Sequence, residues 1–390
     1  MFTFALITYS GHNISDLLTT DIFRPLTIYY HTLISLQGIP IPHYLITNTL
    51  ISSCLPPPHR INPIHILCTT DANYAAYCGV MLTSLLESNP HNSFVIHIMT
   101  DGIGQEDCAR FDRLVRRYKC QIETITIPQT LIDYLPDHIG KWPRSICFRL
   151  LAPDLLQPDV KRIIYLDCDI TVDADLMPLW ETDLEGMPCG AVTEEEGPDS
   201  ALMLHACKAV ADLDPSLRYF NSGVLLMDIS MFRTQRLHVK ALECIREKSH
   251  LLQCPDQDAL NIVLRQQCKP LPLRWNVQSR FFIKSYFAML PALKRDMMRT
   301  IAQRKISGII HFTGEKHPWD KDALLFHPFW YLWYRALRKS PWHKSCPLIR
   351  PSSLRKALAI SKLKLLRRLG FRSSYDTIWI DTTVSALTSQ

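Results

Sequence analysis

The sequence predicts an α/β domain with a mainly parallel central sheet. From residue 64 onward, apolar runs of strand length alternate with stretches whose apolar residues recur at helical spacing. Aspartates follow several of these apolar runs, which is typical of sheets that bind ligands beyond the carboxyl ends of parallel strands.

The alternation is clearest in the first third of the domain. The apolar runs "IHILCTT" and "FVIHIMT" and the alternating "IETITI" predict strands, while "AAYCGVMLTSLLES" and the charged, amphipathic "DCARFDRLVRRYK" predict helices. Asn89-Pro90 is expected to end the first helix, because proline disfavours a helical residue before it. The expected elements are a strand at 64–70, a helix at 75–88, a strand at 94–100, a helix at 107–119 and a strand at 122–127.

A later apolar run, "RIIYLDCDI" (162–170), is expected to form one buried strand. With it, aspartates follow three strands, which suggests a shared crevice lined by Asp71, Asp101, Asp167 and Asp169. Residues i and i+2 of a strand point to the same side, so Asp167 and Asp169 are expected to face one divalent cation. Their oxygen ligands suit Mg²⁺ or Mn²⁺, whereas an isolated D-x-D more often marks a solvated turn.

A phosphatase is a second interpretation of the same stretch. "DCDIT" also fits D-x-D-x-T, the nucleophile motif of haloacid-dehalogenase-like phosphatases, with Asp167 attacking phosphorus. That motif lies on the first strand of its fold, whereas several strands precede it here. The later acidic stretch "PDQD" (255–258) leads into a helical pattern instead of ending a strand, which further disfavours a phosphatase.

Composition and charge divide the 390 residues unevenly. Residues 323–375 contain 12 Lys and Arg and no Asp or Glu, although the whole chain is only +6, so the basic character belongs to the C-terminal tail. The 13 cysteines, several of them in apolar runs such as Cys68, Cys147 and Cys189, predict reduced, buried thiols; without a C-x-x-C pair, zinc is not expected.

These patterns predict three regions. Residues 1–60 form an N-terminal extension that ends in the proline run "LPPPHR" and lacks a clear transmembrane or signal-peptide pattern. It is either a membrane-surface segment or translated sequence upstream of the true start. Residues 61–345 form the α/β domain, and residues 346–390 form a basic amphipathic tail.

Six longer stretches carry a resemblance to a known family: "CTTDANYAAYCGVMLTSLL" (68–86), "CFRLLAPDLL" (147–156), "RIIYLDCDITV" (162–172), "YFNSGVLLMDISMFR" (219–233), "CPDQDALNIVL" (254–264) and "IIHFTGEKHPW" (309–319). They occur in the order found in glycosyltransferase family 8, and the chain resembles this family over about residues 62–345. The resemblance is strongest to bacterial lipopolysaccharide core glucosyltransferases and galactosyltransferases, a subgroup that "SPWHKSCPL" (340–348) also resembles. It implies a GT-A fold, a UDP-glucose or UDP-galactose donor, Mn²⁺ (or Mg²⁺) and transfer with retention of configuration.

The resemblance also implies a role for each matching residue. Asp167, Asp169 and His311 correspond to the metal ligands, and Asp167 also to a ribose contact. Arg149, Asn221 and Ser222 correspond to contacts of the donor sugar, and Gly223 permits close backbone approach. The residues that hold uracil and ribose in the family correspond to Asp71, Asn73 and Tyr74.

The catalytic face corresponds to Asp256, Gln257 and Asp258. Asp256 matches the residue that grips donor-sugar hydroxyls, and Gln257 matches the group nearest the β side of the anomeric carbon. Two routes stay open: a covalent intermediate on a side chain, or same-face attack by the acceptor with the UDP phosphate taking its proton.

One position departs from the family pattern H-x-x-G-x-x-K-P-W. Gly314 matches, but His317 occupies the position of the lysine that contacts the diphosphate, and Lys316 lies one place earlier. Either residue can therefore supply the positive charge. A non-catalytic UDP-sugar-binding relative is the further alternative that this departure leaves open.

The tail predicts the location of the protein. In "SSLRKALAISKLKLLRRLGF" a leucine stripe lies beside basic residues, which predicts a helix on an anionic membrane surface; the alternative is packing of the leucines on the domain. A lipid-linked core oligosaccharide acceptor would place the protein in the cytoplasm, peripheral to the inner membrane. Nucleic acid is not expected, because no motif accompanies the charge. The stripe comprises Leu354, Leu358, Leu365 and Leu369.

Overall fold

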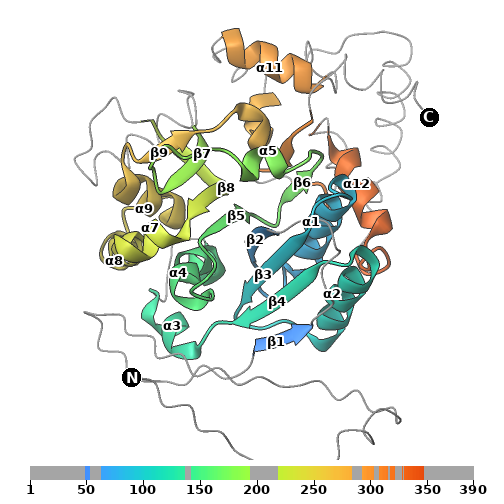
Figure 1. Ribbon diagram of the computed structural model, residues 1–390, viewed down its shortest axis with the longest axis horizontal. Helices are drawn as coiled ribbons and strands as arrows, with labels where there is room; N and C mark the ends of the chain where they lie inside the picture. The colour runs from blue at the N-terminus through green and yellow to red at the C-terminus, as the bar shows by residue number, and fades with distance from the viewer. Residues whose placement is uncertain are drawn as a thin grey trace, which may run out of the picture.

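The computed structural model shows a central sheet covered by helices on both faces (Figure 1). Among its described residues, no helix is both long and apolar enough to cross a membrane. The predicted tail lies outside the described residues except for Cys346. The structure describes residues 49–52, 63–136, 142–193, 218–282, 292–302, 307–314, 317–320, 327 and 329–346.

The central sheet has eight strands in the order β1-β4-β3-β2-β5-β8-β7-β9. Strands β4, β3, β2 and β5 run parallel, β8 is antiparallel to β5 and β7, and β1 pairs antiparallel with β4 at the edge. The sheet is thus mainly parallel at its centre, as predicted. Its strands are β1 (Thr49–Ser52), β2 (Ile64–Thr69), β3 (Phe94–Thr100), β4 (Gln121–Thr126), β5 (Arg162–Leu166), β7 (Cys189–Thr193), β8 (Phe220–Asp228) and β9 (Cys268–Pro270).

Two hydrophobic cores lie on the two faces of this sheet. One packs beneath α1 (Ala75–Ser88), α2 (Gln105–Tyr118) and α12 (Trp330–Lys339). The other packs beneath α3 (Gln129–Tyr134), the 3₁₀ helix η2 (Arg144–Leu151), α4 (Ala152–Leu155), α7 (Ile229–Thr234), α8 (Leu237–Lys248) and α9 (Pro255–Leu264). The remaining helical segments are α5 (Met177–Trp180), η3 (Leu273–Trp275), η4 (Ser279–Phe282) and α11 (Ala292–Ala302).

The expected strands and helices between residues 64 and 127 are confirmed. Helix α1 ends at Ser88, and the side chain of Asn89 donates to the carbonyl oxygens of Leu85 and Ala174, so it closes the helix and ties it to the segment around Ala174. Cys68, Cys147 and Cys189 are buried free thiols, also as expected.

The expectation of one strand over residues 162–170 is wrong. Strand β5 ends at Leu166, Cys168 and Asp169 form a turn, and β6 (Ile170–Val172) belongs to a second sheet with β10 (Val277–Gln278) and β11 (Ile309–His311). The Cys168 thiol donates to the carbonyl of Thr69. The chain leaves the main sheet here because Ile170 and Val172 bury their side chains in the core beneath α1.

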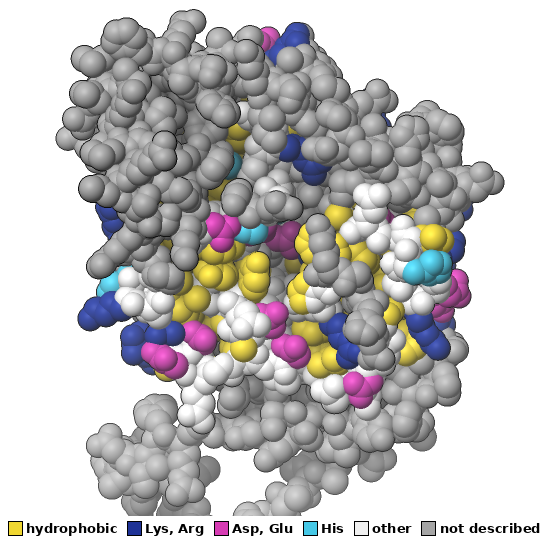
Figure 2. All heavy atoms as spheres, turned by 180° about the vertical axis from the view of Figure 1, so that it is seen from behind, with side chains coloured by type: hydrophobic (Ala, Val, Ile, Leu, Met, Phe, Trp, Pro, Cys, Tyr) yellow, Lys and Arg dark blue, Asp and Glu magenta, His cyan; other side chains and the backbone are white. Residues whose placement is uncertain are grey.

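Charged side chains are unevenly distributed on the face of the molecule opposite to the view of Figure 1. Figure 2 shows apolar side chains with acidic side chains and a histidine among them, while the basic side chains lie mostly toward the edges. On the described part of this face, no continuous basic patch is visible.

Gly79, in α1, leaves room for the side chain of Trp342, which follows α12. A Cβ atom on Gly79 would lie 2.2 Å from the ring of Trp342, which is fully buried and donates its indole N–H to Asp107. We expect Gly79→Ala to destabilise the protein by about 1–3 kcal/mol, because overpacking outweighs the gain of roughly 0.5–1 kcal/mol from alanine in a helix. Urea unfolding measures the change.

Two further variants test the steric reason. Gly104→Ala, at the N-cap of α2 with open space around its Cβ, should cost only the loss of a favoured capping residue, on the order of 0.5–1 kcal/mol. The penalty of Gly79→Ala should shrink when Trp342→Leu removes the ring. An equal penalty in both backgrounds would show that Trp342 is not its cause.

Candidate functional site

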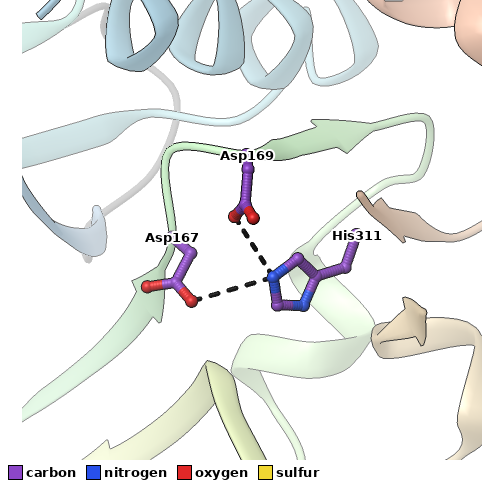
Figure 3. A group of neighbouring side chains, drawn as sticks. All are labelled: Asp167, Asp169 and His311. Atoms are coloured by element: carbon purple, nitrogen blue, oxygen red, sulfur yellow. Dashed lines mark ion pairs between the residues drawn. The ribbon is translucent and has the colours of Figure 1, made fainter. Parts of the chain in front are cut away.

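Three side chains from distant parts of the chain converge beyond the carboxyl end of β5 (Figure 3). Asp167 follows β5, Asp169 lies in the turn before β6, and His311 is the last residue of β11. His311 Nε2 lies 3.1 Å from an Asp169 oxygen and 3.8 Å from an Asp167 oxygen. The antiparallel pairing of β11 with β6 produces this contact, because it sets His311 opposite Ile170, the neighbour of Asp169.

The three residues fit a divalent cation. One ligand atom from each lies within 4.8 Å of the others. Bond lengths of about 2.1 Å in an octahedral shell give adjacent ligand atoms a separation of about 3 Å, so the two measured distances are close to what a cation requires. Two carboxylates and one imidazole suit Mn²⁺, and Mg²⁺ accepts a similar set when water completes its shell.

The electrostatics of this cluster also favour a cation. Burial opposes ionisation of Asp169, but His311 outweighs it and lowers the pKa of the carboxyl group. Burial likewise opposes charge on His311, but the Asp169 and Asp167 carboxylates raise the pKa of the imidazole. The raised pKa favours a proton on His311 beside the two acids, a positive charge that a divalent cation would replace on binding.

Gly223, on β8, makes room for this cluster. A Cβ atom there would lie 2.2 Å from His311 and 2.6 Å from an Asp167 oxygen, and the Gly223 carbonyl accepts a hydrogen bond from the backbone of Asp167 at 2.9 Å. The close approach expected at this glycine thus involves the side chains of His311 and Asp167.

Arg149 is buried beside the cluster, with 4% of its surface exposed. Its guanidinium donates to Asp167 at 2.9 Å and lies 3.3 Å from an oxygen of Asp256 and 2.8 Å from the carbonyl of Ser222. It also lies over the ring of Tyr165, 4.1 Å from the centroid. Burial disfavours its charge, yet Asp167, Tyr165 and Asp256 raise its pKa, so the guanidinium stays charged. Arg149 is therefore a buried, charged member of the site.

The acidic stretch "PDQD" begins α9, as its sequence context predicts. Burial raises the pKa of Asp256, and Asp167 adds to this effect while Arg149 opposes it. Gln257 accepts from the side chain of Asn221 at 2.9 Å and from the backbone of Ser222 at 3.0 Å. Asp258 points differently: its oxygens accept from the hydroxyl of Tyr219 and from the backbone before α9, so it holds the start of the helix.

Residues expected at the nucleotide lie at the start of α1. An Asp71 oxygen accepts from the backbone N–H groups of Asn73 and Tyr74, at 2.8 and 3.0 Å, so Asp71 caps the turn before α1. Asn73 and Tyr74 are exposed. The Tyr74 ring meets Trp319 edge-on. Although 39% of Tyr74 is exposed, its partial burial together with nearby Asp169 raises the pKa of the Tyr74 hydroxyl to about 12. Burial raises the pKa of Asp101, and the negative charge of Asp71 adds to this effect.

His317 is held on two sides. Its ring is parallel to that of Trp319 at 4.8 Å, and its backbone N–H and Nδ1 both contact Asp320, at 2.7 and 3.3 Å. Its Nε2 lies 3.8 Å from Asp169 and thus faces the cluster of Asp167, Asp169 and His311. Gly314, at φ +97°, supplies the left-handed turn before it. Lys316 lies outside the described residues.

Three buried side chains at the site were not predicted from the sequence. Tyr165 donates its hydroxyl to Asp167 at 2.7 Å, Tyr219 bonds both Gln257 and Asp258, and Asn276 contacts His311 at 2.9 Å. The only available signal was a polar group within an apolar run, as in "YLDCD" and "LRWNVQ".

Comparison with known proteins agrees with this geometry. Residues 65–323 match the model of "Glycosyl transferase family 8". A lipopolysaccharide 1,2-glucosyltransferase of Escherichia coli K12 is 30% identical over 71% of this chain and 78% of its own length. General stress protein A of Bacillus subtilis is 28% identical over 72% of this chain and 95% of its own length. A lipopolysaccharide 1,3-galactosyltransferase of Salmonella typhimurium is 26% identical, with 72% and 79% covered.

Solved structures identify the fold. The galactosyltransferase LgtC, in complex with donor and acceptor sugar analogues, superposes with a TM-score of 0.59 at 22% identity, over 72% of this chain and 99% of its own. An active-site mutant of LgtC superposes with a TM-score of 0.60 at 21% identity, with the same coverage. The fold is of the GT-A type, and the family match displaces the phosphatase interpretation of Asp167. The chain belongs to glycosyl transferase family 8.

Proposed function

We propose that this glycosyltransferase moves glucose or galactose from its UDP-sugar to a lipopolysaccharide core oligosaccharide, with retention of configuration. The observation that carries the proposal is the convergence of Asp167, Asp169 and His311 beside the buried Arg149–Asp256 pair. A cation site for a diphosphate then adjoins polar groups suited to a sugar. The names of the relatives from Escherichia coli and Salmonella typhimurium support the acceptor class.

The donor would lie along these groups from base to sugar. Asp71, Asn73 and Tyr74 would hold uracil and ribose, through hydrogen bonds and an aromatic face. Asp167, Asp169 and His311 would hold Mn²⁺ or Mg²⁺, which when bound neutralises charge on the leaving UDP. Donor-sugar hydroxyls would meet a polar cluster formed by Arg149, Asn221, Ser222 and Asp256.

Gln257 bears on the route of transfer. Its amide oxygen already accepts two hydrogen bonds, and its nitrogen donates to Tyr219 at 2.9 Å. An amide oxygen held in this way is a poor nucleophile, which favours same-face attack over a covalent intermediate on Gln257. In that route the acceptor oxygen bonds the anomeric carbon as the bond to the UDP oxygen breaks, and the acceptor proton passes to the departing phosphate.

An assay of donor hydrolysis tests the proposed class of reaction. An active transferase should slowly release UDP from UDP-glucose or UDP-galactose with Mn²⁺, and a screen against truncated core oligosaccharides should identify an acceptor. A non-catalytic relative would bind the donor without releasing UDP. That outcome would overturn the proposal.

The metal ligands give a first prediction. We expect Asp169→Asn to lower transfer by more than about 100-fold, because losing a ligand should cost more than losing one of its supporting partners, typically 10–100-fold. Asp173→Asn is the matched control, since Asp173 pairs with Arg335 instead of the cluster. Chelator should abolish wild-type transfer and Mn²⁺ restore it; full activity in chelator would refute the metal assignment.

The departure at His317 gives a second prediction. We expect His317→Lys to preserve or raise transfer, because lysine places a permanent charge near the diphosphate. His317→Ala should lower kcat/KM by about 10- to 100-fold, as the loss of a charge-assisted hydrogen bond of about 1.5–3 kcal/mol implies. If His317→Lys were as damaging as His317→Ala, the pocket would require an imidazole; if His317→Ala were harmless, Lys316 would be the better candidate.

The tail gives a third prediction. We propose that residues 346–390 hold the protein on the cytoplasmic face of an anionic membrane, because basic residues accompany the leucine stripe. Deleting residues 350–390 should abolish co-sedimentation with anionic vesicles and leave donor hydrolysis within about twofold, because every proposed site residue precedes residue 320. Binding of the intact chain should weaken with salt, which screens charges over about 8 Å at physiological ionic strength.

A charge variant separates attraction from packing. Replacing Lys362, Lys364, Arg367 and Arg368 with glutamine should weaken vesicle binding and keep the leucines. Unfolding of the truncated protein would show instead that the leucine stripe is part of the domain core. If the truncated protein bound vesicles as well as the intact chain, the membrane contact would belong to another segment.

A further inference from the structure

Asn276 connects the metal cluster to the groups proposed to contact the sugar. It lies between η3 and β10, with none of its surface exposed. Its side chain contacts His311 Nδ1 at 2.9 Å and Asn221 Oδ1 at 2.7 Å. Neither contact involves solvent, so the orientation of this one amide decides which groups donate and which accept.

Backbone groups fix that orientation. The N–H of Gly223 donates to Asn221 at 3.0 Å, and a backbone N–H can only donate, so the atom that it meets is the amide oxygen of Asn221. This oxygen also faces Asn276, which must therefore present its NH₂ group to it. The oxygen of Asn276 is then left facing His311.

The same order of hydrogen-bond donors and acceptors continues to α9. The backbone N–H of Ser222 identifies the oxygen of Gln257, which also accepts from the Asn221 NH₂ group. The Gln257 NH₂ group donates to the Tyr219 hydroxyl, which donates to Asp258. We call this chain the amide relay; its members in order are His311, Asn276, Asn221, Gln257, Tyr219 and Asp258.

We infer that Asn276 is a positioning residue that fixes the tautomer of His311. An oxygen facing Nδ1 requires a proton on that nitrogen, and a neutral imidazole then keeps its lone pair on Nε2. Nε2 is the atom that faces Asp167 and Asp169. The relay thus aims an unprotonated nitrogen at the proposed cation, as the hydrogen-bond partners of metal-bound histidines generally do.

The relay also makes Asn276 a junction, because the amide that holds His311 holds Asn221 as well. Loss of the side chain should affect both the cation and the donor sugar. Asn276→Asp should separate the two effects: a carboxylate can accept from His311 but cannot donate to Asn221. This inference rests on the proposed function, since it assumes that His311 binds a metal.

The decisive experiment measures Mn²⁺ affinity by electron paramagnetic resonance, without substrate. We expect Asn276→Ala to weaken binding by about 10- to 100-fold. Asn276→Asp should keep the affinity within about threefold of wild type, yet raise KM for donor hydrolysis. Asn261→Ala is the matched control: Asn261 is another buried amide, but it bonds the backbone of Phe220 and Gln257 and no metal ligand, so its loss should leave Mn²⁺ affinity unchanged.

A second measurement reads the tautomer in the intact protein. With ¹⁵N-labelled histidine and diamagnetic Mg²⁺, the His311 ring, assigned through His311→Gln, should carry its proton on Nδ1. A proton on Nε2, or equal Mn²⁺ affinity of wild type and Asn276→Ala, would overturn the role of Asn276. Failure of wild type to bind Mn²⁺ or Mg²⁺ would instead overturn the proposed metal site.

Discussion

The buried guanidinium of Arg149 is the interaction on which the rest of the site depends. It arises from η2 and contacts the end of β5 through Asp167, β8 through Ser222 and the start of α9 through Asp256. Removing one partner of a buried ion pair costs about 3–5 kcal/mol, because the other charge is left uncompensated. The same contact therefore joins three elements of the fold and balances two acids at the site.

Much of the fold could be predicted because local patterns determine it. Strands β2–β4 and helices α1 and α2 have the period, length and end signals of their class, and they lie where these signals predict. Asp167 and Asp169 were recognisable as candidate cation ligands from their chemistry, but His311 entered only through family resemblance. Nothing in the spacing of residues 169 and 311 indicates that they meet.

What could not be predicted depends on contacts between distant segments. Strands β6, β10 and β11 have two or three residues each, too few for a pattern, and their pairing depends on partners that are distant in the chain. The D-x-D stretch was therefore assigned to one extended strand when it turns between two sheets. Asn276 likewise shows its role only through burial. The resemblance indicated Arg149 as a sugar contact, but no local pattern reveals its burial or its ion pairs with Asp167 and Asp256.

The fit of Trp342 over Gly79 has a consequence for synthesis on the ribosome. The two residues are far apart in the chain, so α1 leaves the exit tunnel long before the indole that covers it. Until then an apolar surface of α1 has no cover, and nascent chains with such surfaces are prone to association and chaperone binding. Closure of this core is thus a late event in biogenesis, and chains interrupted shortly before Trp342 should be ready substrates for proteolysis.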